Sequence, residues 1–121
     1  GVAYYKMHDE ADLALDTFPF NGLTVTCFAA WMGVPTISFA ARRSASRVGY
    51  AIASRLGLSD ALTSSERDDL PAKAYRLAVD LDRLAKMRQE MRSRMRQGVT
   101  NVAEWTRDFE RRIIQLVGKR K

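Results

Sequence analysis

The sequence predicts an α/β fold in which a partial parallel sheet with its helices is followed by a helical tail. Two observations support this prediction. Short apolar runs alternate with helical patterns before residue 60, and the later residues show uninterrupted helical spacing. The 121 residues are enough for one compact unit.

The first part of the chain has the order of two strand–loop–helix units. This order implies parallel pairing, so functional loops are expected at the carboxyl ends of the strands, after Asp16 and Phe39. Gly33 and Gly57 are expected to end the two helices. The expected elements are a helix end over 2–10, a strand over 12–16, a turn over 17–22, a helix from Leu23 or Thr24 to Met32, a strand over 34–39 and a helix over 44–56.

The tail is expected to be helical throughout. Its methionine stripe favours core packing over a ligand surface. Gly98 is expected to end one helix, and Asn101 is expected to cap the next. The expected helices cover 66–80, 82–97 and 101–117.

Composition excludes several classes of protein. With 46% hydrophobic and 28% charged residues the chain is globular. No apolar run approaches the ~18–20 residues of a membrane span, and no signal-peptide pattern is present. We therefore expect a cytoplasmic protein with no membrane partner. Cys27 and His8 are the only cysteine and histidine, so we expect no internal disulfide and no zinc site. No cofactor is expected.

The formal charge of +6 is unevenly distributed. Residues 1–71 carry −2, and residues 72–121 carry +8. Six cations of one tail helix raise the possibility of nucleic-acid binding. They surround much of that helix without interleaved exposed aromatic residues, so a solvated face is favoured and nucleic acid is not an expected partner. These cations are Arg83, Lys86, Arg88, Arg92, Arg94 and Arg96.

The loop after the first strand leads directly into a helix start at Asn21–Thr26. Free amides, the positive end of the helix dipole and the hydroxyls of Thr24 and Thr26 suit a phosphate or diphosphate. The segment is neither a P-loop nor a GxGxxG motif. A capped helix after an ordinary loop explains it equally well, so both interpretations remain open at this point.

Four motifs follow one another in the first part of the chain: Ala11-Asp-Leu-Ala-Leu-Asp-Thr-Phe-Pro-Phe-Asn-Gly22, Thr24-Val-Thr-Cys27, Ala30-Trp-Met-Gly-Val-Pro35 and Ala45-Ser-Arg-Val48. In this order they resemble the O-linked N-acetylglucosamine transferases, with the plant SPINDLY proteins and TPR-containing bacterial relatives. The resemblance implies a GT-B fold, with two Rossmann-like domains around a nucleotide-sugar cleft. It implies that 1–71 is the nucleotide-sugar-binding segment of the C-terminal domain, and that the helices of 72–121 pack on the same domain.

The resemblance also implies an activity. Family members transfer N-acetylglucosamine from UDP to a protein Ser/Thr, with inversion and without a metal. Because the chain begins at Gly1 without Met, we expect a piece of a longer protein. Its N-terminal catalytic domain and TPR region would precede this piece, which alone would be inactive and whose catalytic residues are not identified. The alternative is an impaired relative that serves as a binding or interaction module.

Five positions carry over from the family to the donor site. Thr24 would place its hydroxyl and amide on the diphosphate, and Val25 would offer only its amide, where a second Thr is usual. Asn21 and Gly22 match the loop that approaches the donor sugar and diphosphate. Tyr4 matches an aromatic residue or His near the uridine, although packing of an amphipathic helix explains Tyr4 equally well.

Two positions depart from the family pattern. Leu23 stands where many members have His or another small or polar residue. Phe28, one turn after Thr24, replaces an Asp or Glu that accepts hydrogen bonds from the ribose hydroxyls. Loss of such a buried pairing costs ~1–3 kcal/mol. The change therefore affects donor affinity, donor identity or catalysis itself.

The loop after the second strand carries three arginines. For Arg42 and Arg43 a solvated basic loop is favoured over contact with diphosphate or acceptor. For Arg47, inside the last motif, diphosphate contact and pairing with an acidic neighbour both remain open. Ser44 is expected to cap a helix. We do not expect it to act as a nucleophile, because His8 is the only histidine that could activate it.

Two aspartates bracket the first strand. Asp12 and Asp16 lie ~13 Å apart in an extended chain, too far for a carboxylate pair. We expect Asp16 to hold the loop or touch the donor, and we expect Asp12 to be structural.

Overall fold

A three-stranded parallel sheet lies at the centre of the fold, which confirms the predicted α/β class. The computed structural model describes residues 2–119. The strands are β1 (Ala14–Leu15), β2 (Thr36–Phe39) and β3 (Thr63–Ser64), in that spatial order. All three therefore end at the same edge of the sheet. The paired residues are Ala14 with Thr36, Leu15 with Ile37, Ser38 with Thr63 and Phe39 with Ser64.

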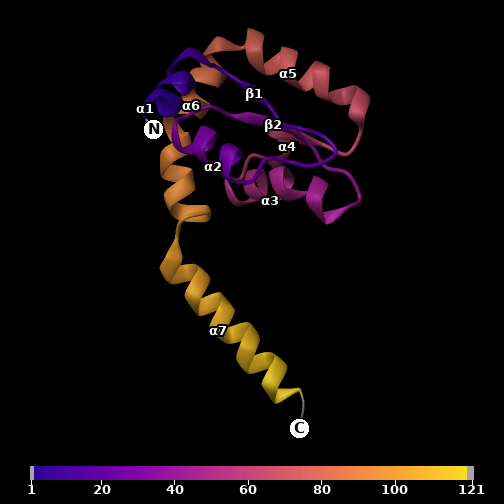
Figure 1. Cartoon of the computed structure of the whole chain (residues 1–121), viewed down its shortest axis with the longest axis vertical. Helices are drawn as coiled ribbons and strands as arrows, with labels where there is room; N and C mark the ends of the chain where they lie inside the picture. The colour runs from indigo at the N-terminus through magenta and orange to yellow at the C-terminus, as the bar shows by residue number, and fades with distance from the viewer. Residues whose placement is uncertain (1, 120–121) are drawn as a thin grey trace.

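Helices flank the sheet on both sides. α5 covers one face, and α2 and α3 lie against the other (Figure 1). The helical elements are α1 (Val2–Lys6), a 3-10 turn η1 (Met7–Glu10), α2 (Thr24–Trp31), η2 (Ser44–Ser46), α3 (Val48–Arg55), α4 (Ser59–Leu62), η3 (Arg67–Asp69), α5 (Leu70–Val79), α6 (Leu81–Gly98) and α7 (Val102–Gly118).

The core joins the sheet to the first two helices of the tail. Ile37 of β2 and Ile52 of α3 belong to the same buried cluster as Leu77 of α5. α6 contributes its whole buried stripe to this cluster, which confirms that the methionines pack. The buried residues of α6 are Leu84, Met87, Met91 and Met95.

Glycines end three helices, as predicted, but for two different reasons. Gly33 and Gly57 have φ of 81° and 68°, a left-handed conformation that residues with a Cβ rarely adopt. Gly98 is the last residue of α6. A Cβ at Gly98 would lie 2.1 Å from the carbonyl oxygen of Arg55, so this glycine is needed for close contact between α6 and α3.

Several element boundaries differ from the prediction. The predicted helix over 44–56 divides into η2 and α3, and Ser44 does not cap it, because no side chain makes a cap hydrogen bond at either start. The predicted helix over 66–80 begins as η3 and becomes α-helical at Leu70, with Pro71 in its first turn. The strand β3 was not predicted. It has two residues, too few for a period to appear in the sequence.

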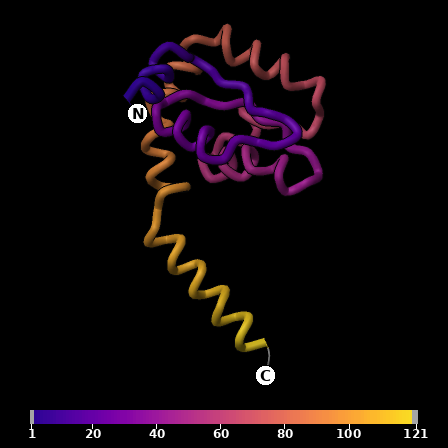
Figure 2. Tube along the Cα trace, in the orientation of Figure 1, coloured from indigo at the N-terminus to yellow at the C-terminus, as the bar shows by residue number. Residues whose placement is uncertain are grey.

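The last helix extends away from the rest of the chain (Figures 1 and 2). Asn101 caps it as predicted, because its Oδ1 accepts a hydrogen bond from Glu104 N at 3.1 Å. No residue of α7 is buried. Its apolar face is exposed to solvent and includes Trp105 and Phe109, whose rings stack with centroids 5.1 Å apart.

Candidate functional site

Asp16 organises the loop between β1 and α2. Its Oδ1 accepts hydrogen bonds from Thr17 N at 2.9 Å and Gly22 N at 2.8 Å, and its Oδ2 accepts one from the Ser38 hydroxyl at 2.7 Å. Both carboxylate oxygens are thus used inside the protein. Asp16 therefore holds the loop, which is one of the two roles expected for it.

Asn21 fastens the same loop to the one that follows β2. Its side chain is fully buried, donates to Thr17 O at 3.1 Å and accepts from Gly49 N at 3.3 Å. Its backbone N–H donates to Ala45 O at 3.0 Å. The amide of Asn21 is therefore engaged within the protein, and Asn21 shapes the loop that leads to the helix start.

Residues outside the predicted set complete this connection between the loops. The Ser46 hydroxyl donates to Pro19 O, and Ser38 reaches Asp16 from β2. Gly49 permits the close approach, because a Cβ there would lie 2.2 Å from Ser38 Oγ. Sequence reasoning missed Ser38 and Gly49. For Ser46 the only signal was its place in the Ala45–Val48 motif.

The loop leads into the N-terminus of α2, which has no side-chain cap. Leu23 occupies the N-cap position and makes no side-chain cap hydrogen bond. Leu23, Thr24 and Val25 are exposed, and the structure shows no protein partner for the N–H groups of Thr24 and Val25 in residues 2–119. The positive end of the α2 dipole therefore faces solvent with free donors, an arrangement that suits an anion.

Only one of the two expected hydroxyls remains available at this helix start. The Thr26 hydroxyl is buried and donates to Gly22 O at 2.7 Å, which corrects its predicted place on a phosphate. The Thr24 side chain is exposed. A phosphate at this site would therefore meet one hydroxyl and the backbone amides.

Aromatic rings gather one turn along α2. Phe28 contacts the rings of Tyr4 and Tyr5 edge to face, with centroids 6.1 and 5.7 Å apart. His8 is buried beside Tyr4, with ring centroids 5.1 Å apart, and its Nδ1 lies 3.0 Å from Tyr4 O. The structure thus brings together Tyr4 and Phe28, the two positions that the resemblance placed near the uridine.

In residues 2–119 no hydrogen bond from a side chain of Arg42, Arg43 or Arg47 reaches this helix start. Arg42 and Arg43 are exposed, as a solvated loop requires. The Arg47 guanidinium stacks over the Tyr50 ring at 5.0 Å. Arg47 also lines a groove of about 520 Å³ with residues of β3, α4 and α5. No ion pair joins Arg47 to an acidic side chain in residues 2–119, and diphosphate contact stays a prediction.

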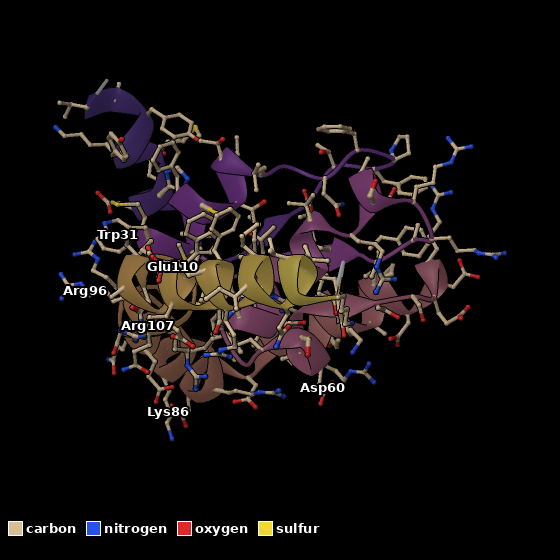
Figure 3. The ribbon with its side chains drawn as sticks, turned by 90° about the horizontal axis from the view of Figure 1, so that it is seen from below. Trp31, Asp60, Lys86, Arg96, Arg107 and Glu110 are labelled. Carbon is tan, nitrogen blue, oxygen red and sulfur yellow. The ribbon has the colours of Figure 1, made fainter. Side chains whose placement is uncertain are left out.

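Arginines of α6 are largely engaged within the protein. Arg88 pairs with Asp12 and also donates to Ala11 O at 3.0 Å. Asp12 therefore has the structural role expected of it. The guanidiniums of Arg92 and Arg96 each lie 5.6 Å from the Trp31 ring centroid, and Figure 3 shows Arg96 on the same side of the molecule as Trp31. Trp31 belongs to α2 and is half-buried, so these two cations pack against the protein's own surface.

Residues 2–119 contain no group of three or more side chains that could hold a metal ion. No helix among them is both long enough and apolar enough to cross a membrane.

The chain resembles known proteins along most of its length. It is 33% identical over 100 residues to a probable UDP-N-acetylglucosamine–peptide N-acetylglucosaminyltransferase SPINDLY of Solanum lycopersicum, covering 82% of this chain and 11% of that protein. It is 32% identical over 101 residues to a UDP-N-acetylglucosamine–peptide N-acetylglucosaminyltransferase of Caenorhabditis elegans, covering 83% of this chain and 9% of that protein.

A solved structure agrees with these sequence matches. A mutant O-GlcNAc transferase of Thermobaculum terrenum superposes with a TM-score of 0.78 at 28% identity, covering 92% of this chain and 22% of that one. The chain thus spans about a tenth of the length of the curated relatives above. The sequence profile of glycosyl transferase family 41 matches residues 5–109. The chain belongs to glycosyl transferase family 41.

Proposed function

We propose that this chain is the donor-binding part of a glycosyltransferase that takes a UDP-sugar, UDP-N-acetylglucosamine first among them. The observation that carries the proposal is the uncapped start of α2, held in place by Asp16 and Asn21, in a chain of family 41. The names of its relatives specify UDP-N-acetylglucosamine as donor and a peptide as acceptor.

The diphosphate would rest on the N–H groups of Thr24 and Val25 and on the Thr24 hydroxyl. Backbone donors and the helix dipole balance negative charge, so we propose that no metal takes part. In the transfer, a Ser/Thr hydroxyl oxygen of the acceptor would bond to the anomeric carbon of the sugar, with inversion. The bond from that carbon to the diphosphate breaks, UDP leaves with the electron pair, and the acceptor proton passes to a base outside this chain.

Binding of UDP tests the site directly. The chain is expected to bind UDP, and Thr24→Ala is expected to weaken binding about tenfold or more, because a hydrogen bond to a charged group is lost. Isothermal titration calorimetry measures both. The matched control is Thr106→Ala, because Thr106 is an exposed helical threonine on α7. This variant should leave the affinity for UDP unchanged. Equal affinities for all three proteins would contradict the proposed site.

Transfer itself requires more than this chain. We propose that the chain is part of a longer protein that also has a further catalytic domain of a GT-B fold and a TPR region. We propose that this longer protein lies in the cytoplasm. The chain alone is expected to transfer no N-acetylglucosamine to a Ser/Thr peptide. Radiolabelled sugar on the peptide after incubation with these 121 residues would overturn this expectation.

A second candidate function follows from Phe28. An impaired relative would bind the nucleotide sugar, or a partner protein, without turnover, and the aromatic cluster at α2 favours this candidate because it offers the ribose no carboxylate. Turnover by the longer protein, measured with UDP-N-acetylglucosamine and an acceptor protein, separates the two candidates. UDP binding alone is compatible with both.

A further inference from the structure

Phe28 lies where a nucleoside would follow a bound diphosphate. It comes four residues after Thr24, so the two side chains share one face of α2, one helical turn apart. In a nucleoside diphosphate the ribose is joined to the first phosphate through its 5′ oxygen. The ribose of a nucleotide held at Thr24 is therefore within reach of Phe28, about one turn of ~5 Å along the helix.

The surface around Phe28 consists of ring edges and faces. Phe28 packs against Tyr4 and Tyr5 at interplanar angles of 75° and 85°. The hydroxyl oxygen of Tyr4 is buried and is therefore closed to a ligand on the surface. The cluster can pack against a sugar or a base, but it offers no strong acceptor to a ribose hydroxyl.

Asp12 and Asp16, the carboxylates on either side of β1, are engaged within the protein. α2 contains no acidic residue. Both oxygens of Asp16 accept hydrogen bonds within the loop and from β2, and Asp12 pairs with Arg88 of α6. No carboxylate of α2 or of the β1–α2 loop is left to receive the 2′ or 3′ hydroxyl.

We propose that Phe28 makes this nucleotide site indifferent to the 2′ hydroxyl of the ribose, so that 2′-deoxynucleoside diphosphates bind as well as ribonucleoside diphosphates. The inference rests on the proposed donor site at α2. A site with a buried hydrogen-bonding group rejects an analogue that lacks the hydroxyl, because the group is left unpaired. An apolar wall has no such group and discriminates poorly between the two forms.

Titration with two nucleotides tests the inference. The 121-residue chain is titrated with UDP and with 2′-deoxy-UDP by saturation-transfer NMR, which detects weak binding. The two dissociation constants are expected to agree within about threefold, as an apolar wall predicts. A preference for UDP greater than about threefold would overturn the inference and leave the proposed donor site intact.

Two variants at Phe28 sharpen the test. Phe28→Asp supplies an acceptor and is expected to shift the preference toward UDP by about tenfold. Phe28→Leu removes the ring without adding an acceptor, so it is expected to weaken both nucleotides and to keep their ratio. A ratio that does not change in Phe28→Asp, with folding verified by circular dichroism, also counts against the inference. If Phe28→Asp does not fold, the ratio of the unmodified chain still decides.

Failure of the proposed function gives a different result. If neither nucleotide receives saturation transfer from the unmodified chain at millimolar concentration, the donor site at α2 is wrong, and the inference falls with it. If UDP binds and Thr24→Ala binds it equally well, the site lies elsewhere. A ribose preference, or a ratio that does not change in Phe28→Asp, refutes the inference about Phe28 alone when UDP binding depends on Thr24.

Discussion

At the scale of single residues, Asp16 is the side chain on which the candidate site depends most. It joins the end of β1 to Gly22, just before α2, and to Ser38 of the neighbouring strand. Hydrogen bonds to an ionised acceptor are stronger than neutral ones. Because both of its oxygens are used in this way, Asp16 sets the position of the amides that follow Gly22.

Replacement of this carboxylate should destabilise the fold. Asp16→Ala is expected to lower the free energy of unfolding by about 2–3 kcal/mol, because the buried Ser38 hydroxyl and the half-buried Gly22 N–H lose their charged acceptor. Urea denaturation followed by circular dichroism measures the loss. Asp12→Ala is the matched control. Its side chain is 84% exposed in its ion pair with Arg88, so a change below about 1 kcal/mol is expected. Equal losses would contradict the assigned role of Asp16.

The reactivity of the Cys27 thiol reports how far this side chain of α2 is buried. Burial raises the pKa of the Cys27 thiol, because removal from water disfavours the charged thiolate. The thiol is thus more fully protonated at neutral pH than a free cysteine, and alkylation by iodoacetamide is expected to be slower in the folded chain than in urea. The rate should rise only as pH approaches the raised pKa. Mass spectrometry follows both rates, and faster alkylation of the folded chain would contradict the prediction.

At the scale of elements, the contact between α6 and α3 depends on a glycine. Gly98→Ala would place a Cβ 2.1 Å from the Arg55 carbonyl oxygen, and is expected to cost about 1–3 kcal/mol of stability. Thermal unfolding measures this cost. Gly118→Ala is the matched control, because a Cβ there meets no atom within 4 Å and improves helix propensity. A Gly98→Ala chain as stable as this control would show that α6 does not approach α3 so closely.

Elements that are set by neighbouring residues in the sequence could be predicted. Elements that depend on residues far away in the sequence could not. Gly33, Gly57 and Asn101 act on their own helix ends, so their roles were visible in the sequence. The strand β3 exists only because β2 lies beside it, and its two residues show no period of their own. The 3-10 turn at Ser44 likewise has no cap that a local pattern could reveal.

In the candidate site, too, features set by neighbouring residues could be predicted and long-range contacts could not. The helix start after Gly22 follows from the Asn21–Thr26 segment, and the expectation that Asp16 holds the loop came from its place at a strand end. The pairings of Asp16 with Ser38 and of Asn21 with Gly49 span 22 and 28 residues, beyond any local pattern. Even the Thr26 hydroxyl was misassigned, because its bond to Gly22 depends on how the loop turns.

At the scale of the whole molecule, α7 stands apart from the core. A chain that ends at residue 101 is expected to change its free energy of unfolding by less than about 1 kcal/mol, because no residue of α7 is buried. Binding of the dye ANS should fall at the same time, since the exposed apolar face is removed. Leu84→Ala in the buried stripe of α6 is the comparison and should cost about 2–5 kcal/mol. A comparable loss from the truncation would show that α7 packs on the core.

The basic tail has an electrostatic effect on the near-neutral half of the chain. Arg92 donates to the carbonyl of Trp31, the last residue of α2, and Arg94 donates to the carbonyl of Leu56, which follows α3. Both carbonyls lie at the negative ends of their helices, which cations stabilise. One end of α2 is thus closed by a cation from the tail, while its positive end at Thr24 stays free. Two of the cations that suggested a nucleic-acid partner thus act inside the molecule, as counter-charges at the negative ends of α2 and α3.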